Sequence, residues 1–199
     1  MSYEVPAGSW EVEHLVKKSR FIARILPIQS RADVQPALSA AQADYPDARH
    51  YCWAYLLGKP QDAGSAGMSD DGEPAGTAGR PILNVLQHGH LGDVLIIVIR
   101  YFGGIKLGAG GLVRAYSAAA QLAVDQAPSQ RLVAYDYWRA CGDFSCEQPL
   151  RHWLAEQGGE VDEVHYSEQV CVDLHLPVEL SEQLTQWCAA HQVVLTDLS

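Results

Sequence analysis

Apolar and polar positions along the first part of the chain predict strands and helices in turn. Residues 10–16 (WEVEHLV) alternate between apolar and polar, which predicts a strand. Residues 21–28 (FIARILPI) predict the returning strand of a hairpin, with residues 17–20 as its turn. Residues 30–45 carry apolar side chains at helical spacing between a serine cap and a proline stop, and residues 50–57 (HYCWAYLL) predict a further strand.

The middle of the chain contains the strongest strand signal. Residues 58–79 are polar and rich in glycine, which predicts a long surface loop that is functional or mobile. Residues 81–87 (PILNVLQ) predict a short helix. Residues 94–99 (VLIIVI) are an unbroken apolar run rich in β-branched residues, which predicts a strand buried on both faces. A glycine-rich loop over residues 100–111 and a helix over residues 112–127 follow.

The last third of the chain alternates cleanly between strand and helix patterns. Strands are predicted over residues 133–141, 160–166, 169–176 and 193–198, and helices over residues 143–157 and 178–191. Residues 160–166 and 169–176 form a hairpin in this prediction. The resulting order, β-α-β-β-α-β, is that of the ferredoxin-like split βαβ fold.

The distribution of charge indicates a domain boundary. The chain has 199 residues and a net charge of −10. Residues 1–131 contain twelve Lys and Arg and twelve Asp and Glu, whereas residues 132–199 contain two and twelve. We therefore predict two domains, 1–131 and 132–199, and expect a polyanion to dock only on the first. The composition is that of a soluble globular protein, and neither a membrane span nor a signal peptide is expected.

Cysteine and histidine usage predicts neither a metal site nor a nucleophile. The five cysteines are odd in number and contain no C-x-x-C pair, which favours a cytoplasmic protein with reduced thiols. Potential zinc ligands are scattered, and Cys52, within a strand, favours a buried small hydrophobe. No Ser-His-Asp order or G-x-S-x-G motif is present. We predict no catalytic residue, metal or cofactor, and a non-enzymatic role is favoured.

The glycine-rich turn is the first candidate site. A buried strand, a glycine turn and a helix start form a recurrent anion-binding geometry, because the first N–H groups of the helix point at the ligand. The predicted phosphate- or nucleic-acid-binding residues are Arg100, Tyr101, Gly103, Gly104, Lys106, Gly108, Gly110, Gly111 and Arg114. The turn matches neither the Walker nor the dinucleotide pattern. The alternative, that its glycines serve tight strand–helix packing, stays open.

The acidic loop over residues 69–80 is the second candidate. Its predicted site residues are Asp70, Asp71, Gly72, Glu73, Thr77 and Arg80. Three carboxylates in four residues would suit Mg²⁺ or Ca²⁺, but their spacing does not fit the EF-hand pattern. One alternative is a solvated turn that favours the next helix, with Thr77 as its cap. Another is a loop whose acids pair with Arg49, Arg80 or Arg100. We favour a structured surface loop with a binding role.

A basic hairpin is the third candidate. Lys17, Lys18, Arg20 and Arg24 lie on it, and Tyr101 and Phe102 would offer stacking surface for bases. An exposed turn and strand-end core residues explain the same pattern equally well.

Two long motifs resemble those of a known family. Residues 69–79 (SDDGEPAGTAG) and 100–112 (RYFGGIKLGAGGL) look like the hallmark motifs of the Impact family. Residues 18–23 (KSRFIA) and 46–50 (PDARH) fit the family too. The resemblance covers almost the whole chain, and the layout is similar to that of the bacterial YigZ-type two-domain members.

The resemblance implies an α+β fold class. The first domain is expected to resemble the second domain of ribosomal protein S five and domain IV of elongation factor G. The second is expected to be a ferredoxin-like βαββαβ domain similar to domain V of the same factor.

Bacterial members of the family are biochemically uncharacterised, so function follows from fold analogy alone. The analogy implies a non-enzymatic cytoplasmic regulator that binds RNA, the ribosome or a translation component through residues 1–131. The alternatives are a binding protein or enzyme for a phosphorylated small molecule at the glycine turn, and a scaffold for a protein partner. The kinase-pathway role of eukaryotic relatives uses an added N-terminal RWD domain. That role is not expected here, because the chain starts at the Impact domain. No oligomeric state is predicted.

Overall fold

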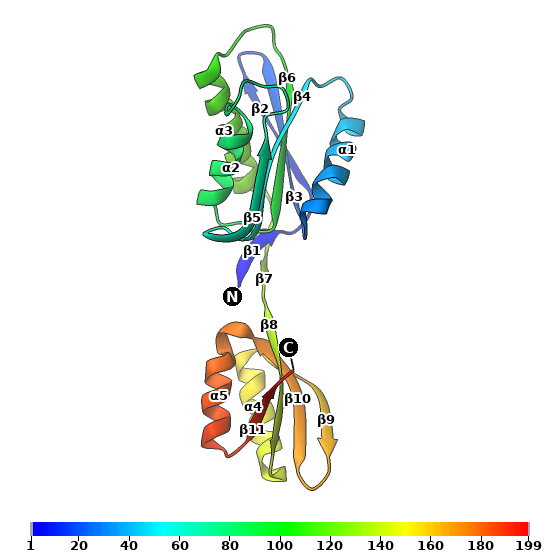
Figure 1. Ribbon diagram of the computed structural model, residues 1–199, viewed down its shortest axis with the longest axis vertical. Helices are drawn as coiled ribbons and strands as arrows, with labels where there is room; N and C mark the ends of the chain where they lie inside the picture. The colour runs from blue at the N-terminus through cyan, green and yellow to red at the C-terminus, as the bar shows by residue number, and fades with distance from the viewer. Residues whose placement is uncertain (1, 199) are drawn as a thin grey trace. The chain divides into compact units, whose positions relative to one another are not determined.

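The computed structural model describes residues 2–198 and divides into two compact units (Figure 1). The first unit comprises Tyr3–Arg131, and the second comprises the chain from Leu132 onward together with Ser2. Each unit has its own hydrophobic core. Across the described residues, no helix is long and apolar enough to cross a membrane.

A five-stranded antiparallel sheet is the centre of the first unit. Its strands, in spatial order, are β2 (Trp10–Val16), β3 (Ser19–Pro27), β6 (Val94–Tyr101), β4 (His50–Lys59) and β5 (Asp62–Ser69). The first seven residues of β6 are buried. This burial confirms the strand predicted from the apolar run and explains why that run does not alternate. A separate two-stranded ribbon pairs β1 (Tyr3–Pro6) with β7 (Ser129–Leu132).

Helices cover both faces of this sheet (Figure 1). On one face lie α2 (Gly79–His88) and α3 (Ala109–Gln126), and on the other lies α1 (Val34–Asp44), which follows a 3₁₀ turn over Arg31–Asp33. Alternate residues of β6 point to the two faces. Val94, Ile96 and Val98 join the core beneath α2 and α3, and Leu95, Ile97 and Ile99 join the core beneath α1.

The prediction of an unbroken loop over residues 58–79 is wrong, because residues 62–69 form strand β5. This strand pairs with β4 from Trp53 opposite Ser69 to Lys59 opposite Asp62. Apart from Met68, its side chains are small, and most are exposed, so no hydrophobic alternation marks the strand. Backbone pairing with β4 alone defines it. The glycine loop is also shorter than predicted, since α3 begins at Ala109.

The second unit confirms the ferredoxin-like order. Its antiparallel sheet has the spatial order β11 (Val194–Asp197), β8 (Tyr135–Gly142), β10 (Val170–Pro177) and β9 (Glu160–Tyr166). The helices α4 (Glu147–Gln157) and α5 (Ser181–Ala190) follow 3₁₀ turns over Phe144–Cys146 and Val178–Leu180. Alternate, fully buried residues of β10 pack with Leu150 and Leu184 of these helices in one core.

The expectation of reduced thiols is wrong for one pair, because Cys141 and Cys171 form a disulfide between β8 and β10. The two residues are direct neighbours in the strand register, with their Cα atoms 4.1 Å apart. The two cysteines are 30 residues apart in the sequence, so the disulfide could not be predicted without the strand register that brings them together. The other three cysteines are free and buried. Burial raises the pKa of the Cys52 thiol to about 12.

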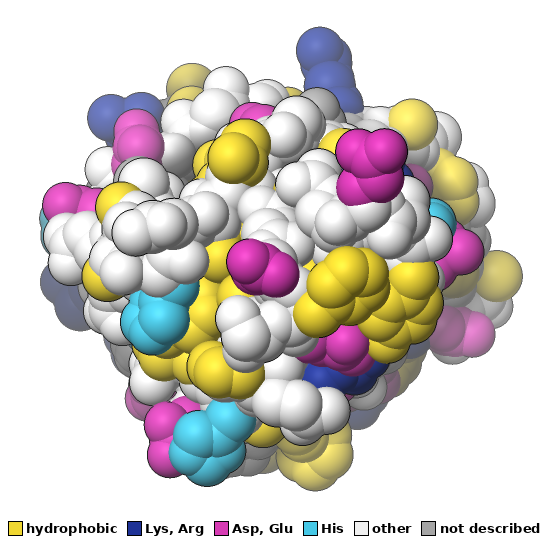
Figure 2. All heavy atoms as spheres, turned by 90° about the horizontal axis from the view of Figure 1, so that it is seen from below, with side chains coloured by type: hydrophobic (Ala, Val, Ile, Leu, Met, Phe, Trp, Pro, Cys, Tyr) yellow, Lys and Arg dark blue, Asp and Glu magenta, His cyan; other side chains and the backbone are white. Residues whose placement is uncertain are grey.

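The positive charges of the second unit are neutralised. Only Arg139 and Arg151 lie in residues 132–198, and they pair with Asp173 at 2.6 Å and Glu147 at 2.9 Å. On the face of the molecule shown in Figure 2, acidic and histidine side chains lie among hydrophobic and uncharged ones. The described part of this unit therefore has no unpaired Lys or Arg to attract a polyanion.

Candidate nucleic-acid interface

A buried ion pair joins the acidic loop to the start of the glycine-rich turn. Arg100, on β6, donates from Nη1 to Oε1 of Glu73 at 2.5 Å, and the two side chains are 8% and 4% exposed. Tyr116, on α3, donates its hydroxyl to the same oxygen at 2.8 Å. Burial raises the pKa of Tyr116, so its hydroxyl stays protonated and available as a donor. Of the pairings considered from the sequence, Glu73 with Arg100 is therefore the one that forms.

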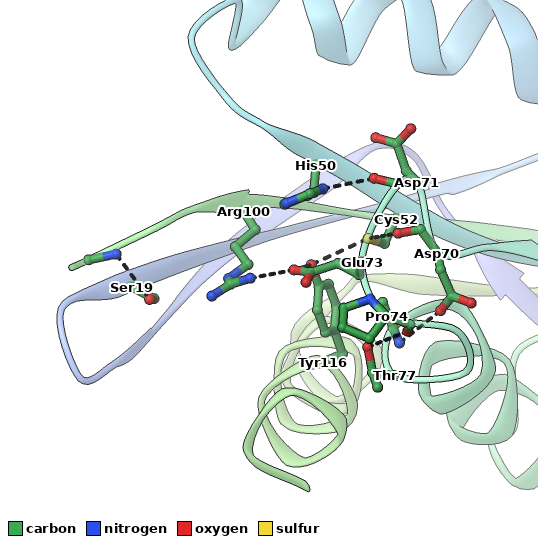
Figure 3. Close-up of polar contacts among 12 residues, drawn as sticks. Ser19, His50, Cys52, Asp70, Asp71, Glu73, Pro74, Thr77, Arg100 and Tyr116 are labelled. Carbon is green, nitrogen blue, oxygen red and sulfur yellow. Dashed lines mark hydrogen bonds and ion pairs between the residues drawn. The ribbon is translucent and has the colours of Figure 1, made fainter. Parts of the chain in front are cut away.

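Figure 3 shows how four elements contribute to this cluster. Arg100 comes from β6, Glu73 from the loop after β5, Tyr116 from α3 and Cys52 from β4, and their side chains point toward one another. The Cys52 thiol lies 3.3 Å from the Tyr116 hydroxyl and 3.0 Å from the carbonyl oxygen of Asp70. Removing one partner of such a buried pair would leave an uncompensated buried charge, which is strongly destabilising. Keeping the pair together therefore holds the acidic loop against the start of the glycine-rich turn.

Arg100 keeps donors that Glu73 does not use. Its Nε is buried and has no hydrogen-bond partner within the described chain. Figure 3 shows the second terminal nitrogen directed away from Glu73. The guanidinium carbon lies 5.5 Å from the ring centre of Phe21 and 5.8 Å from that of Phe102. Arg100 is therefore held between an ion pair and two aromatic rings, with part of its fork unpaired.

The remaining acids of the loop shape its backbone. Asp70 accepts hydrogen bonds from the N–H groups of Gly76, Ala78 and Gly79 at 2.8–2.9 Å. Partial burial would raise the pKa of Asp70, but these three bonds outweigh it, and the pKa lies below its ordinary value. Asp71 accepts from the N–H of Tyr51 at 2.6 Å. The two carboxylates thus serve backbone donors rather than a cation.

Thr77 does not cap α2, which corrects the sequence-based alternative. Its hydroxyl donates to the carbonyl oxygen of Pro74 at 2.7 Å, inside the loop. Asp70 instead serves the first N–H groups of the helix, from across the loop. Within residues 2–198 the only cluster with metal-ligand spacing is Glu163, His165 and Asp173, in the second unit.

That cluster is a poor cation site. Arg139 donates to both carboxylate oxygens of Asp173, at 2.6 and 2.7 Å. The guanidinium therefore already neutralises the best-placed ligand of the three.

Different structural constraints account for the glycines of the turn. A Cβ on Gly103 would lie 2.0 Å from the carbonyl carbon of Lys18, so packing against the β2–β3 turn requires glycine there. Gly108 precedes α3 with φ +72°, a conformation that favours glycine. Gly110 is helical, and its Cβ would meet only Nη1 of Arg114, at 3.8 Å. Packing therefore explains Gly103, backbone conformation explains Gly108, and neither explains Gly110.

A groove of about 350 Å³ lies where the two motifs meet, and we call it the first groove. Glu73 and Pro74 of the acidic loop line it. Its other lining residues are Arg49, His50, Arg100, Phe102, Lys106, Leu107, Gly108, Ala109 and Leu112. The structure therefore brings both predicted loops to one concave surface.

Positive charge and free donors face the first groove. Arg49 and Lys106 are exposed, and no described acidic side chain forms an ion pair with either. Gly108 offers no side-chain cap, so the N–H groups of the first turn of α3, from Ala109 to Gly111, have no helical acceptor. Phe102, which is 50% exposed, adds an aromatic surface. The groove combines cations, amide donors and a ring.

Four of the fifteen predicted site residues line the first groove: Glu73, Arg100, Lys106 and Gly108. The other eleven are not among its lining residues, and three of these eleven carry a cation or an aromatic ring. Arg80 is exposed at the start of α2, and Tyr101 is half-buried with the Arg20 guanidinium 5.3 Å from its ring centre. Arg114 lines a second groove of about 350 Å³, together with His14, Val16, Lys17, Leu107, Gly111, Ala115 and Ala118.

Two polar groove residues were not predicted from the sequence as ligand contacts. Arg49 and His50 reach the groove because His50 pairs with Arg100 in the register of β4 and β6. The basic hairpin is weaker than predicted, since Arg20 pairs with Glu13 and Arg24 pairs with Glu11. Only Lys17 and Lys18 of that hairpin are free of an acidic partner among the described side chains.

Fold and site together define a two-domain α+β protein in which an acidic loop and a glycine-rich turn share one groove. The family model for the Impact N-terminal domain matches residues 17–124, which include the whole groove. A second model, domain of unknown function (DUF1949), matches residues 143–190. The chain belongs to the Impact family.

Relatives support this membership over most of the chain. The IMPACT family member YigZ of Escherichia coli is 35% identical over 88% of this chain and 86% of its own length. An IMPACT family member of Haemophilus influenzae is 47% identical over 61% of this chain and 59% of its own length. A solved structure described as that of a hypothetical protein has a TM-score of 0.68 at 31% identity, covering 100% of this chain and 98% of that one.

Proposed function

We propose that the protein is a non-enzymatic regulator that binds single-stranded RNA, on the ribosome or on another translation component, through the first groove. The observation that carries the proposal is the grouping of unpaired Arg49 and Lys106, the free amides of α3 and the exposed ring of Phe102 around one concave surface. Unpaired cations and amides suit phosphates, and an exposed ring suits an unstacked base.

Arg100 has a positioning part in this proposal as well as a binding one. Its ion pair with Glu73 cancels most of its charge, so it attracts a distant phosphate weakly. Its unpaired nitrogens still offer directional hydrogen bonds at the groove wall. Long-range attraction therefore comes from Arg49 and Lys106, and Arg100 supplies geometry at close range.

The charge of the two units supports a division of labour. The first unit is neutral overall, and four of its cations that form no ion pair with a described acidic side chain, Lys17, Arg49, Lys106 and Arg114, line the two grooves, whereas the second unit carries the whole net negative charge. RNA would be repelled by the second unit and directed to the first. We propose that the second unit makes the protein contact that selects the translation component.

A salt series tests the binding proposal. The probe is a fluorescently labelled 12-nucleotide single-stranded RNA, with anisotropy measured between 50 and 200 mM salt. Each phosphate contact to a single strand contributes a slope of about −0.7 in log K against log salt. Arg49 and Lys106 together are expected to contribute about −1.4 to the wild-type slope. Lys106→Ala and Arg49→Ala should each make it shallower by about 0.7.

The matched control is Arg31→Ala, which removes an exposed arginine that lies away from both grooves. It should leave affinity and slope unchanged. Absence of RNA binding, or equal slopes for wild type, Lys106→Ala and Arg49→Ala, would overturn the proposal. Displacement of the RNA by inorganic phosphate at equal concentration would instead favour a small phosphorylated ligand, because the groove volume alone also suits that alternative.

A further inference from the structure

We infer that the second groove binds the next nucleotide of the same RNA strand, so that the strand crosses the N-terminus of α3 from one groove to the other. This inference rests on the proposed function and adds a second subsite to it. The second groove, between β2 and α3, has the same volume as the first, about 350 Å³. Leu107 lines both grooves and is the point at which they meet.

The spacing of lining residues along α3 supports this path. Ala109 and Leu112 face the first groove, and Gly111, Arg114 and Ala118 face the second. Each set recurs at intervals of three or four residues, so the two sets are two neighbouring stripes of one helix. A strand that occupies both grooves must pass the first turn between these stripes. Its linking phosphate would then face the free N–H groups at that turn.

The chemistry of the second groove is complementary to RNA. Lys17 and Arg114 line it, neither forms an ion pair with a described acid, and no acidic side chain is among its lining residues. Val16, Leu107 and Ala115 are apolar residues of its lining. Two cations in a lining that is otherwise partly apolar suit a phosphate and the face of a base.

The β2–β3 turn holds Lys17 at this groove. Lys17 and Lys18 form a two-residue turn, and both have positive φ, at 46° and 68°. Asn-Gly would adopt this left-handed conformation more easily than two lysines do. The lysine side chains are therefore not explained by the backbone conformation of the turn. The N–H of Gly103 donates to the hydroxyl of Ser19 at 3.1 Å, which fixes the hairpin beside the glycine-rich turn. The hairpin and the glycine-rich turn therefore place their cations on one continuous surface.

A length series with one variant on each side tests the inference. The probes are adenosine 5′-monophosphate, 5′-phosphorylated diadenylate and an oligoadenylate of 12 nucleotides, each competing against the labelled RNA. For the wild type, the dinucleotide should bind about 10-fold more tightly than the mononucleotide, which is the effect of one further charged contact. Arg114→Ala should weaken the two longer ligands about 10-fold and leave the mononucleotide unchanged. Lys106→Ala should weaken all three.

Two results separate the inference from the proposed function. If RNA binds and depends on Lys106 but Arg114→Ala has no effect, the second groove is not a subsite, while the first remains one. If no RNA binds to the wild type, both fail together. Arg31→Ala serves again as the control, and thermal denaturation of Arg114→Ala checks that loss of affinity is not loss of folding.

Discussion

The substitution Gly110→Ala separates the two explanations of the glycine-rich turn, because it should change stability and binding in opposite directions. Gly110 lies in the first turn of α3, its φ is not positive, and the added Cβ would meet only Nη1 of Arg114, at 3.8 Å. Glycine within a helix is less favourable than alanine by about 0.5–1 kcal/mol. The variant should therefore be more stable by up to that amount.

The same methyl group should weaken RNA binding. It lies beside the free N–H groups that we expect to face a phosphate, and it would hold that phosphate away from them. Losing one hydrogen bond to a charged group costs about 1.5 kcal/mol, which is about 10-fold in affinity. Thermal denaturation should show Tm higher by about 3 °C, and anisotropy with the 12-nucleotide RNA should show the weaker binding.

Gly64→Ala is the matched control for this variant. Gly64 lies on β5, its φ is not positive and a Cβ there would meet nothing within 4 Å. The control should not change binding. If Gly110→Ala is stabilised and binds RNA as well as the wild type, the helix amides do not contact phosphate. If it is destabilised, glycine is needed there for the fold, and the structural reasoning about this position is wrong.

Three further predictions test the fold. Gly103→Ala should destabilise the first unit by about 1–3 kcal/mol or more in urea denaturation, because its Cβ would lie 2.0 Å from a backbone carbon of Lys18; an unchanged midpoint would contradict this packing. Under non-reducing conditions iodoacetamide should leave all five cysteines unlabelled, and mild reduction should expose Cys141 and Cys171 alone to mass-spectrometric detection. The lowered pKa of Asp70 predicts stability that is present above its unfolded value of 3.8 and lost as pH falls through the folded value, so Asp70→Asn should lose less stability between pH 5 and 2 than the wild type.

The helices and strands that could be predicted from sequence are those whose hydrophobic pattern lies entirely within their own residues. The β6 run is apolar at every position because both faces of its strand are buried, and the second unit alternates between periods of two and 3.6 residues. Strand β5 could not be predicted, because its small exposed residues carry no periodicity and its pairing with β4 is made by backbone atoms. The disulfide depends in the same way on a register that no local pattern reveals.

The two segments of the candidate site could be located from sequence, but their meeting in one groove could not be predicted. Both motifs were visible as unusual glycine and acid clusters, and the prediction that they mark loops with a binding role stays a prediction. Their meeting depends on the register that sets His50 beside Arg100 and on the turns that direct Glu73 inward. Two arginines differ from expectation in where they lie. Arg80 lies outside the groove, whereas Arg49 lines it.

The buried ion pair of Glu73 and Arg100 holds the two segments that line the first groove in one fixed arrangement. Burying two charges is expensive, and such pairs seldom add net stability relative to apolar residues of similar size. Here the bonds of Glu73 tie the acidic loop to two elements of the fold, to β6 through Arg100 and to α3 through Tyr116. Five positions in the two segments have positive φ: Asp71, Gly72, Gly76, Gly104 and Gly108. Without the ion pair, these turns would have to be ordered by other contacts. A ligand would then have to order them on binding, and the ion pair removes that cost in advance.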